Sequence, residues 1–126
     1  IAHKNGALFH TDAVQSVGHI SIDVKDLGID MLSASAHKFN GPKGIGFLYI
    51  KNGTQIESLL NGGSQERGHR AGTENIASIV GMAVALQKNY AELEVNTKHI
   101  LELENLFFAL YFTSACVILS IAKCHL

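Results

Sequence analysis

The sequence predicts an α/β fold, and two observations carry that prediction. Short apolar runs alternate with turn signals up to about residue 60, which is typical of strands separated by tight connections. From Thr73 onward the apolar residues recur at helical spacing instead. Strands that feed loops rich in polar residues, followed by helices, indicate an α/β domain. No internal repeat and no low-complexity segment interrupts the pattern.

Three strands are expected in the first half of the chain. They are a buried strand at Ala7–Phe9 that ends at His10-Thr11-Asp12, a second at Ile29–Ser35 and a third at Ile45–Lys51. Ala13–Val17 has room for one or two helical turns. Asn40–Gly44 is expected to be a turn, because glycine and proline interrupt both regular structures.

Helical spacing governs the second half. Thr73 is expected to be the N-cap of a helix, with Glu74 in its first turn. The apolar stripe of this helix is expected to comprise Ile76, Ile79, Val80, Ala83, Val84 and Leu86. A second helical pattern runs from about Glu92 through Leu106. Gly62–Gly72, before the first helix, is expected to be a long irregular loop.

The last part of the chain, Asn105–Ala122, carries no charged residue between Glu104 and Lys123. Eighteen uncharged residues stand at the lower limit of a membrane-spanning helix. Polar residues such as Tyr111 and Ser114 weaken that interpretation. A buried helix followed by a strand, or a tail foreign to the parent fold, are the alternatives.

Composition excludes several classes of protein. The 126 residues are 47% hydrophobic and 17% charged, which excludes a disordered chain. A formal charge of −1 offers no basic surface for nucleic acid. Cys116 and Cys124 are too few for a disulfide scaffold, and the seven histidines have no metal-ligand spacing, so no metal site is expected. Residues 1–4 resemble neither a signal nor a transit peptide, and we expect the chain to be an internal piece of a longer protein.

Lys38 is the first candidate for chemistry. It follows an apolar strand among Ala36, His37 and Phe39, where partial desolvation favours an amine that forms a Schiff base. An exposed surface lysine is the alternative. Ser35 and His37 beside it suit an anion, although His37 also fits a purely structural hydrogen bond.

Asp12 is the second candidate, again where a strand meets a loop. Its carboxylate can hold a positive charge such as a protonated pyridine nitrogen, or it can cap the helical turn that follows. Gln15 would face the same way on a helical turn, or remain a solvated amide. In open α/β sheets, chemistry collects beyond the carboxyl ends of strands, where both candidate loops lie.

Two glycine-rich segments differ in how strongly they indicate an anion-binding site. Gly41–Gly46 has neither the phosphate-loop nor the dinucleotide spacing, and a turn before a strand explains it better. Gly63–Thr73 contains two arginines and a histidine and ends at a predicted helix N-terminus, whose amides suit an anion.

Three segments together resemble the cysteine desulfurases of the nitrogen-fixation type: His10–Gly18, Ser33–Gly46 and Gly62–Asn75. These enzymes are class V, fold-type I enzymes that use pyridoxal 5'-phosphate. The resemblance covers residues 1 to about 105. It implies that residues 1–105 are the central part of the cofactor-binding large domain, a mostly parallel sheet with flanking helices. Residues 106–126 match nothing in that family and are expected to be a divergent apolar tail.

The resemblance also implies roles for individual residues. Lys38 is the catalytic lysine, which forms the Schiff base with the cofactor and moves protons at the substrate α-carbon. Asp12 pairs with the pyridinium nitrogen, so that the ring acts as an electron sink. Gln15 hydrogen-bonds the phenolic oxygen of the ring.

The cofactor phosphate is the remaining group to be bound. By resemblance, Ser35 and His37 bind it within one subunit. Thr73 reaches the phosphate of the neighbouring subunit, which implies a homodimer with shared sites. These implied roles agree with the chemistry argued for Ser35, His37 and the loop before Thr73 from the residues themselves.

The implied reaction takes sulfur from L-cysteine and leaves alanine and a persulfide on an enzyme cysteine. The sulfur then passes to iron–sulfur cluster assembly or tRNA thiolation, and a sulfur-accepting scaffold protein is an expected partner. Cys116 lies too soon after Lys38 to take the role of that cysteine. The family's ring-stacking aromatic residue and substrate-carboxylate arginine have no counterpart in this sequence. We therefore expect weak or no activity from this chain alone, in the cytoplasm or an organellar matrix.

Three other interpretations remain open at this point. A selenocysteine lyase-like class V enzyme shares the cofactor but differs in substrate. A non-catalytic remnant would keep the family sequence without binding the cofactor. A membrane-tethered piece, held by Asn105–Ala122, would need detergent, whereas a chain ending near Glu104 would not.

Overall fold

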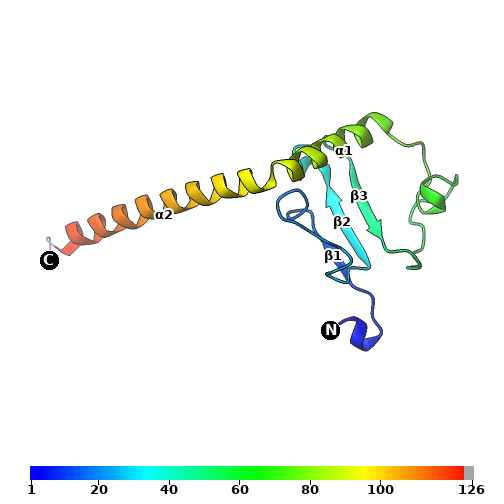
Figure 1. Cartoon of the computed structure of the whole chain (residues 1–126), viewed down its shortest axis with the longest axis horizontal. Coiled ribbons are helices and arrows are strands. Elements are labelled where there is room, and N and C mark those ends of the chain that lie inside the picture. The colour runs from blue at the N-terminus through cyan, green and yellow to red at the C-terminus, as the bar shows by residue number, and fades with distance from the viewer. Residues whose placement is uncertain (124–126) are drawn as a thin grey trace. The chain divides into compact units, whose positions relative to one another are not determined.

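The computed structural model describes the backbone of residues 1–123 and the side chains of residues 1–112. The chain divides into two compact units, Ile1–Ala91 and Glu92–Leu126. The first unit contains a small sheet, three short 3-10 turns and one helix, while the second is a single long helix within its described part (Figure 1). An α/β fold is therefore confirmed for the first unit.

The sheet has three strands in the order β1-β2-β3. They are β1 (His10–Asp12), β2 (Met31–Ser35) and β3 (Gly46–Ile50). β1 runs parallel to β2, with Asp12 opposite Ser33, and β3 runs antiparallel to β2, with Gly46 opposite Ser35. The described sheet is thus mixed rather than mostly parallel. The connection from β2 to β3 is too short for a parallel crossover, so the chain reverses direction.

The first strand lies later than predicted. Ala7–Phe9 precedes β1, and the side chains of Leu8 and Phe9 are 56% and 40% exposed rather than buried. The carbonyl of Phe9 accepts hydrogen bonds from the amides of Asp30 and Met31, at 3.0 and 3.1 Å. Regular pairing begins only at His10. The prediction of a buried strand at Ala7–Phe9 is therefore wrong for the described chain.

The core lies between β2, the turns that flank it and the helix. Alternate residues of β2 point inward, so Leu32 and Ala34 are buried while their neighbours are partly exposed, as the two-residue period of a strand requires. Phe39, just after β2, is completely buried. The other buried apolar side chains are Ala13, Val17, Ile29 and Ala36. The expected turn at Ala13–Val17 forms, because the Ala13 carbonyl accepts from the amides of Ser16 and Val17, both at 3.0 Å.

The helix α1 (Ile76–Ala91) begins later than the sequence suggested. Asn75 is its cap, because its side-chain oxygen Oδ1 accepts a hydrogen bond from the Ser78 amide at 3.2 Å. The prediction of Thr73 as the N-cap is therefore wrong. Threonine and asparagine both cap helices well, so residue type did not distinguish the two positions. The geometry decides, because a cap side chain reaches the amide two or three residues ahead.

The packed face of α1 agrees with the predicted stripe at Leu86 but otherwise differs from it. Met82, Ala85 and Leu86 pack against the core, whereas Ile76, Val80 and Val84 are more than half exposed. Both sets have helical spacing, because α1 is apolar around most of its circumference. Periodicity alone therefore did not identify the face that meets the sheet. α1 runs past the end of the sheet where β2 ends and β3 begins (Figure 1).

The second unit contains the helix α2 (Leu93–Lys123). It continues through residue 106 without a break, so the alternative of a helix followed by a strand is wrong. Neighbouring aromatic rings line it, with Phe107 and Tyr111 stacked at a centroid distance of 6.1 Å. Among the residues that the structure describes, no helix is both long enough and apolar enough to span a membrane. The side chains of Cys116 and Cys124 lie outside the described residues.

Candidate functional site

Two of the candidate segments meet at one edge of the sheet. Asp12 is the last residue of β1, and Ser35 is the last residue of β2. Because these strands are adjacent and parallel, their carboxyl ends lie side by side, and the Ala13 amide donates to the Ser33 carbonyl at 2.9 Å. The 3-10 turn η2 (Ala36–Phe39) follows β2 directly and carries His37 and Lys38. The topology thus brings Asp12 to the edge where the lysine segment begins.

Asp12 is exposed, and its carboxylate is partly occupied. Oδ1 accepts a hydrogen bond from the Val14 amide at 3.0 Å, which supports the capping interpretation of this residue. No other contact of this carboxylate is seen among the described residues. One oxygen therefore holds the turn while the second remains accessible. Gln15 lies exposed in the same turn.

Lys38 is exposed, so of the two interpretations that the sequence left open, the described chain shows the exposed lysine and not the partly desolvated amine. The reason lies in η2, where Ala36 and Phe39 point into the core and leave the two residues between them outside. His37 is exposed for the same reason. Ser35 is partly buried and its side chain does not cap η2. Its hydroxyl makes no hydrogen bond within the described part of the chain.

Thr73 is not joined to these residues by any described contact. It lies exposed in the segment before α1, beyond a loop that makes its own hydrogen bonds. In that loop the Ala71 amide donates to the Leu60 carbonyl at 3.0 Å, and the Gly72 amide donates to Oε1 of Gln65 at 3.1 Å. The predicted role of Thr73 toward a neighbouring subunit stays a prediction.

Two residues that the sequence did not single out as functional hold the backbone at Lys38. His19 lies with Nε2 2.7 Å from the Lys38 carbonyl oxygen, and Asn89 on α1 donates from Nδ2 to the Phe39 carbonyl at 2.7 Å. His19 lies in no recognisable motif, so nothing in the sequence indicated this contact. The signal for Asn89 was available, because it is a polar residue at helical spacing from Met82, Ala85 and Leu86.

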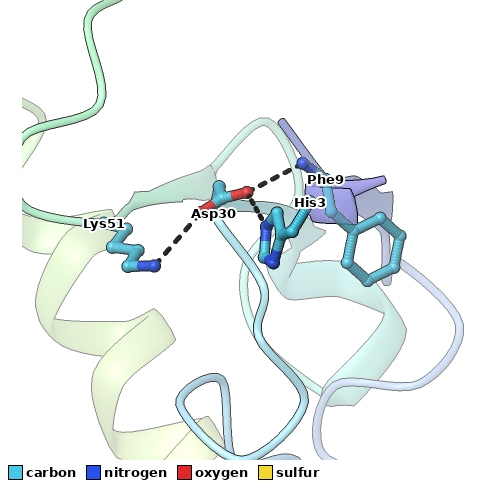
Figure 2. Close-up of polar contacts among 4 residues, drawn as sticks. All are labelled: His3, Phe9, Asp30 and Lys51. Atoms are coloured by element: carbon cyan, nitrogen blue, oxygen red, sulfur yellow. Dashed lines mark hydrogen bonds and ion pairs between the residues drawn. The ribbon is translucent and has the colours of Figure 1, made fainter. Parts of the chain in front are cut away.

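A third missed residue, Asp30, is a buried carboxylate at the other end of β2 (Figure 2). It accepts hydrogen bonds from the Phe9 amide at 2.8 Å and from His3 at 2.6 Å, and Lys51 lies 3.3 Å away. These donors, the Phe9 amide first among them, lower the pKa of Asp30 from 3.8 to about 2. This cluster ties chain segments together at the end of β2 opposite Lys38, so its role is structural.

Known proteins match the part of the chain that contains these residues. The family model "Aminotransferase class-V" matches residues 1–109. Cysteine desulfurase IscS of Dictyoglomus turgidum is 52% identical over 107 residues, which are 85% of this chain and 27% of that protein. Cysteine desulfurase IscS of Clostridium botulinum is 66% identical over 87 residues, 69% of this chain and 22% of that protein. The chain spans about a quarter of the length of these relatives.

Solved structures give the same result. A NifS-like protein superposes with a TM-score of 0.80 at 44% identity, over 83% of this chain and 29% of that one. A structure described as "SspA in complex with cysteine" superposes with a TM-score of 0.66 at 48% identity, over 68% of this chain and 25% of that one. The resemblance to cysteine desulfurases is thereby confirmed. Since the family model spans residues 1–109 and the motifs around Asp12 and Lys38 occur within it, the chain belongs to the aminotransferase class-V family.

Proposed function

We propose that this chain supplies part of the pyridoxal 5'-phosphate site of a cysteine desulfurase. In that reaction sulfur leaves L-cysteine, alanine is released, and the sulfur remains as a persulfide on an enzyme cysteine. One observation carries the proposal: Asp12 and the segment with Lys38, from two separate motifs, meet at one edge of the sheet. The high identity to proteins named cysteine desulfurase supports it.

The side chains at this edge fit the cofactor by their chemistry. Pyridoxal phosphate offers an aldehyde, a basic ring nitrogen and a phosphate, and when bound it supplies an electron sink for bonds at the substrate α-carbon. Lys38 is an exposed primary amine, the complement of an aldehyde. Asp12 retains one carboxylate oxygen beyond its bond to Val14, the complement of a protonated ring nitrogen. The amine of Lys38 and the carboxylate of Asp12 therefore match the aldehyde and the ring nitrogen of the cofactor.

Each residue has a separate task in this proposal. Lys38 holds the cofactor covalently and moves a proton at the α-carbon of L-cysteine. Asp12 keeps the ring nitrogen protonated, because a carboxylate beside a pyridinium favours its charged form. Gln15 donates to the phenolic oxygen of the ring. Ser35 and His37, which flank the start of η2, bind phosphate oxygens through their hydroxyl and ring N–H groups.

A homodimer is part of the same proposal. Thr73 donates a hydrogen bond from its hydroxyl to the phosphate held by the neighbouring subunit. Its exposure supports a role toward a second chain. The similar SspA structure is a complex with cysteine, which supports L-cysteine as the substrate class here. A sulfur-accepting protein partner and a cytoplasmic location remain predictions from the resemblance.

Borohydride trapping tests the proposal. The purified chain is incubated with pyridoxal phosphate, reduced and digested, and the modified lysine is located by mass spectrometry. Selective modification at Lys38, lost in Lys38→Ala, is the expected result. Lys25 is the matched control, because it is exposed and lies outside the site edge. Modification spread equally over Lys25, Lys38 and other lysines, unchanged by Lys38→Ala, would instead indicate a chain that keeps the family sequence without its chemistry.

A further inference from the structure

Asn89 is one of only two buried polar side chains in the described part of the chain, and its amide is fully engaged. Nδ2 donates to the Phe39 carbonyl at 2.7 Å and to the Ala85 carbonyl at 2.8 Å. Oδ1 faces Nδ2 of Asn40 at 3.5 Å. The Ala85 bond lies within α1, but Phe39 is fifty positions away in the sequence. Asn89 thus joins α1 to the turn that carries Lys38.

His19 holds the preceding carbonyl of the same turn. Its Nε2 lies 2.7 Å from the Lys38 carbonyl oxygen. A carbonyl only accepts hydrogen bonds, so Nε2 of His19 is the donor. Two consecutive carbonyls, those of Lys38 and Phe39, are therefore held by side chains from two different segments of the chain.

The packing around Phe39 leaves this arrangement little freedom. Phe39, which follows Lys38 in η2, is completely buried. Gly18, next to His19, approaches it so closely that an added Cβ would lie 2.7 Å from the Cβ of Phe39 and 3.6 Å from that of Asn89. Gly18 also has a positive φ of 81°, which favours glycine. The segments with Gly18, Phe39 and Asn89 thus interlock at the base of η2.

We propose that Asn89 and His19 are positioning residues for Lys38. They hold the two carbonyls of η2 from separate segments and so fix the direction in which the Lys38 side chain leaves the turn. Neither touches the amine itself, and both act through the backbone. The inference rests on the proposed function, in which that amine must meet a bound aldehyde. The side chain of Lys38 is exposed, so its direction depends on the backbone of η2.

Four variants separate positioning from simple stability. Asn89→Leu has nearly the same shape but lacks the donor, and leaves the Phe39 carbonyl without its partner. Leu86→Ala is its matched control, because Leu86 packs on the core from the same helix without bonding η2. His19→Phe removes the donor at an exposed position. His19→Gln keeps an N–H donor at a similar reach and is the conservative rescue.

The experiment measures borohydride trapping of pyridoxal phosphate at Lys38 relative to Lys25, in the full chain, at saturating cofactor. The fraction of folded molecules is measured for each variant by circular dichroism, and labelling is compared at equal folded fraction. Losing one hydrogen bond to the turn, buried at Asn89 and exposed at His19, is expected to lower the Lys38 ratio by about three- to tenfold in Asn89→Leu and His19→Phe. His19→Gln and Leu86→Ala are expected to keep the ratio of the unaltered chain.

Three results would overturn the inference. If His19→Phe and His19→Gln label Lys38 equally, the hydrogen bond does not position the lysine. If Leu86→Ala at equal folded fraction loses as much labelling as Asn89→Leu, Asn89 contributes only to helix packing. If the unaltered chain is not labelled at Lys38 at all, the proposed function fails and the inference fails with it. The first two results leave the proposed function standing, so the two failures are distinguishable.

Discussion

Nε2 of His3 lies 2.6 Å from Oδ2 of Asp30, although 27 positions separate the two residues in the sequence. The same carboxylate oxygen accepts the amide of Phe9, and Lys51 approaches the other oxygen (Figure 2). Asp30 therefore joins the first residues of the chain, the segment before β1 and the end of β3 at one buried point. A buried carboxylate is tolerated because donors surround it.

The hydrogen bonds to Asp30 make the stability of the fold depend on pH. Its donors lower the folded-state pKa from 3.8 to about 2, so the carboxylate stabilises the fold fully above pH 3.8 and loses that contribution as the pH falls toward 2. Asp30→Asn is expected to lower the urea midpoint at pH 7, and the difference from the unaltered chain should shrink across that window. Asp26→Asn, at an exposed carboxylate, is the control. A difference that stays constant down to pH 2 would contradict the assignment.

The start of α1 gives a second prediction. Replacing Asn75 by alanine removes the acceptor of the Ser78 amide and is expected to cost about 1 kcal/mol of unfolding free energy, measured by urea denaturation. Thr73→Ala removes a side chain that caps nothing in the structure and should change it by less than about 0.5 kcal/mol. The opposite order would restore Thr73 as the cap.

Phe39 gives a third prediction, about packing. Its side chain is 0% exposed. Phe39→Ala is expected to lower the free energy of unfolding by about 3–5 kcal/mol, because removing the ring leaves a cavity in the core. Phe107 on α2 is 62% exposed, so Phe107→Ala should alter stability by no more than about 0.5 kcal/mol. Thermal unfolding of both variants checks this. Equal losses would mean that Phe39 is not the centre of the core.

Asp12 gives a fourth prediction, which separates its two tasks. Asp12→Asn keeps an oxygen for the Val14 amide but removes the charge offered to a pyridinium nitrogen. Unfolding free energy should therefore stay within about 0.5 kcal/mol of the unaltered chain. The affinity for pyridoxal phosphate, measured by titration of its absorbance, should fall about tenfold or more, as expected for a lost charge-assisted hydrogen bond. Unchanged affinity would mean that Asp12 stabilises the turn and does not bind the cofactor.

Local pattern predicted two of the three strands well. β2 and β3 lie within the predicted ranges, because alternating or continuous apolar residues bounded by turn residues leave few other structures. The segment before β1 was harder. Leu8 and Phe9 are apolar but exposed in the described chain, and apolar character alone does not say where hydrogen-bonded pairing begins.

The position of the candidate residues after strands predicted the edge of the sheet to which two candidate loops belong, but not the surroundings of each side chain. Asp12 ends β1 and Lys38 lies in the turn that follows β2, and these two adjacent strands are parallel. The exposure of Lys38 depended on the turn after β2, in which Ala36 and Phe39 take the inward positions. That choice is made by packing against α1, a contact between residues about fifty positions apart.

The sequence by itself determined the family, the order of strands and helices, and the chemical types of the site residues, because each depends on residues that are close together in the chain. Tertiary structure alone decided which face of α1 is buried and how Asp30 and Asn89 find their partners. Several apolar stripes of equal local quality were available on α1. Only contacts between distant segments, which bury apolar area and pair polar groups together, select one of them.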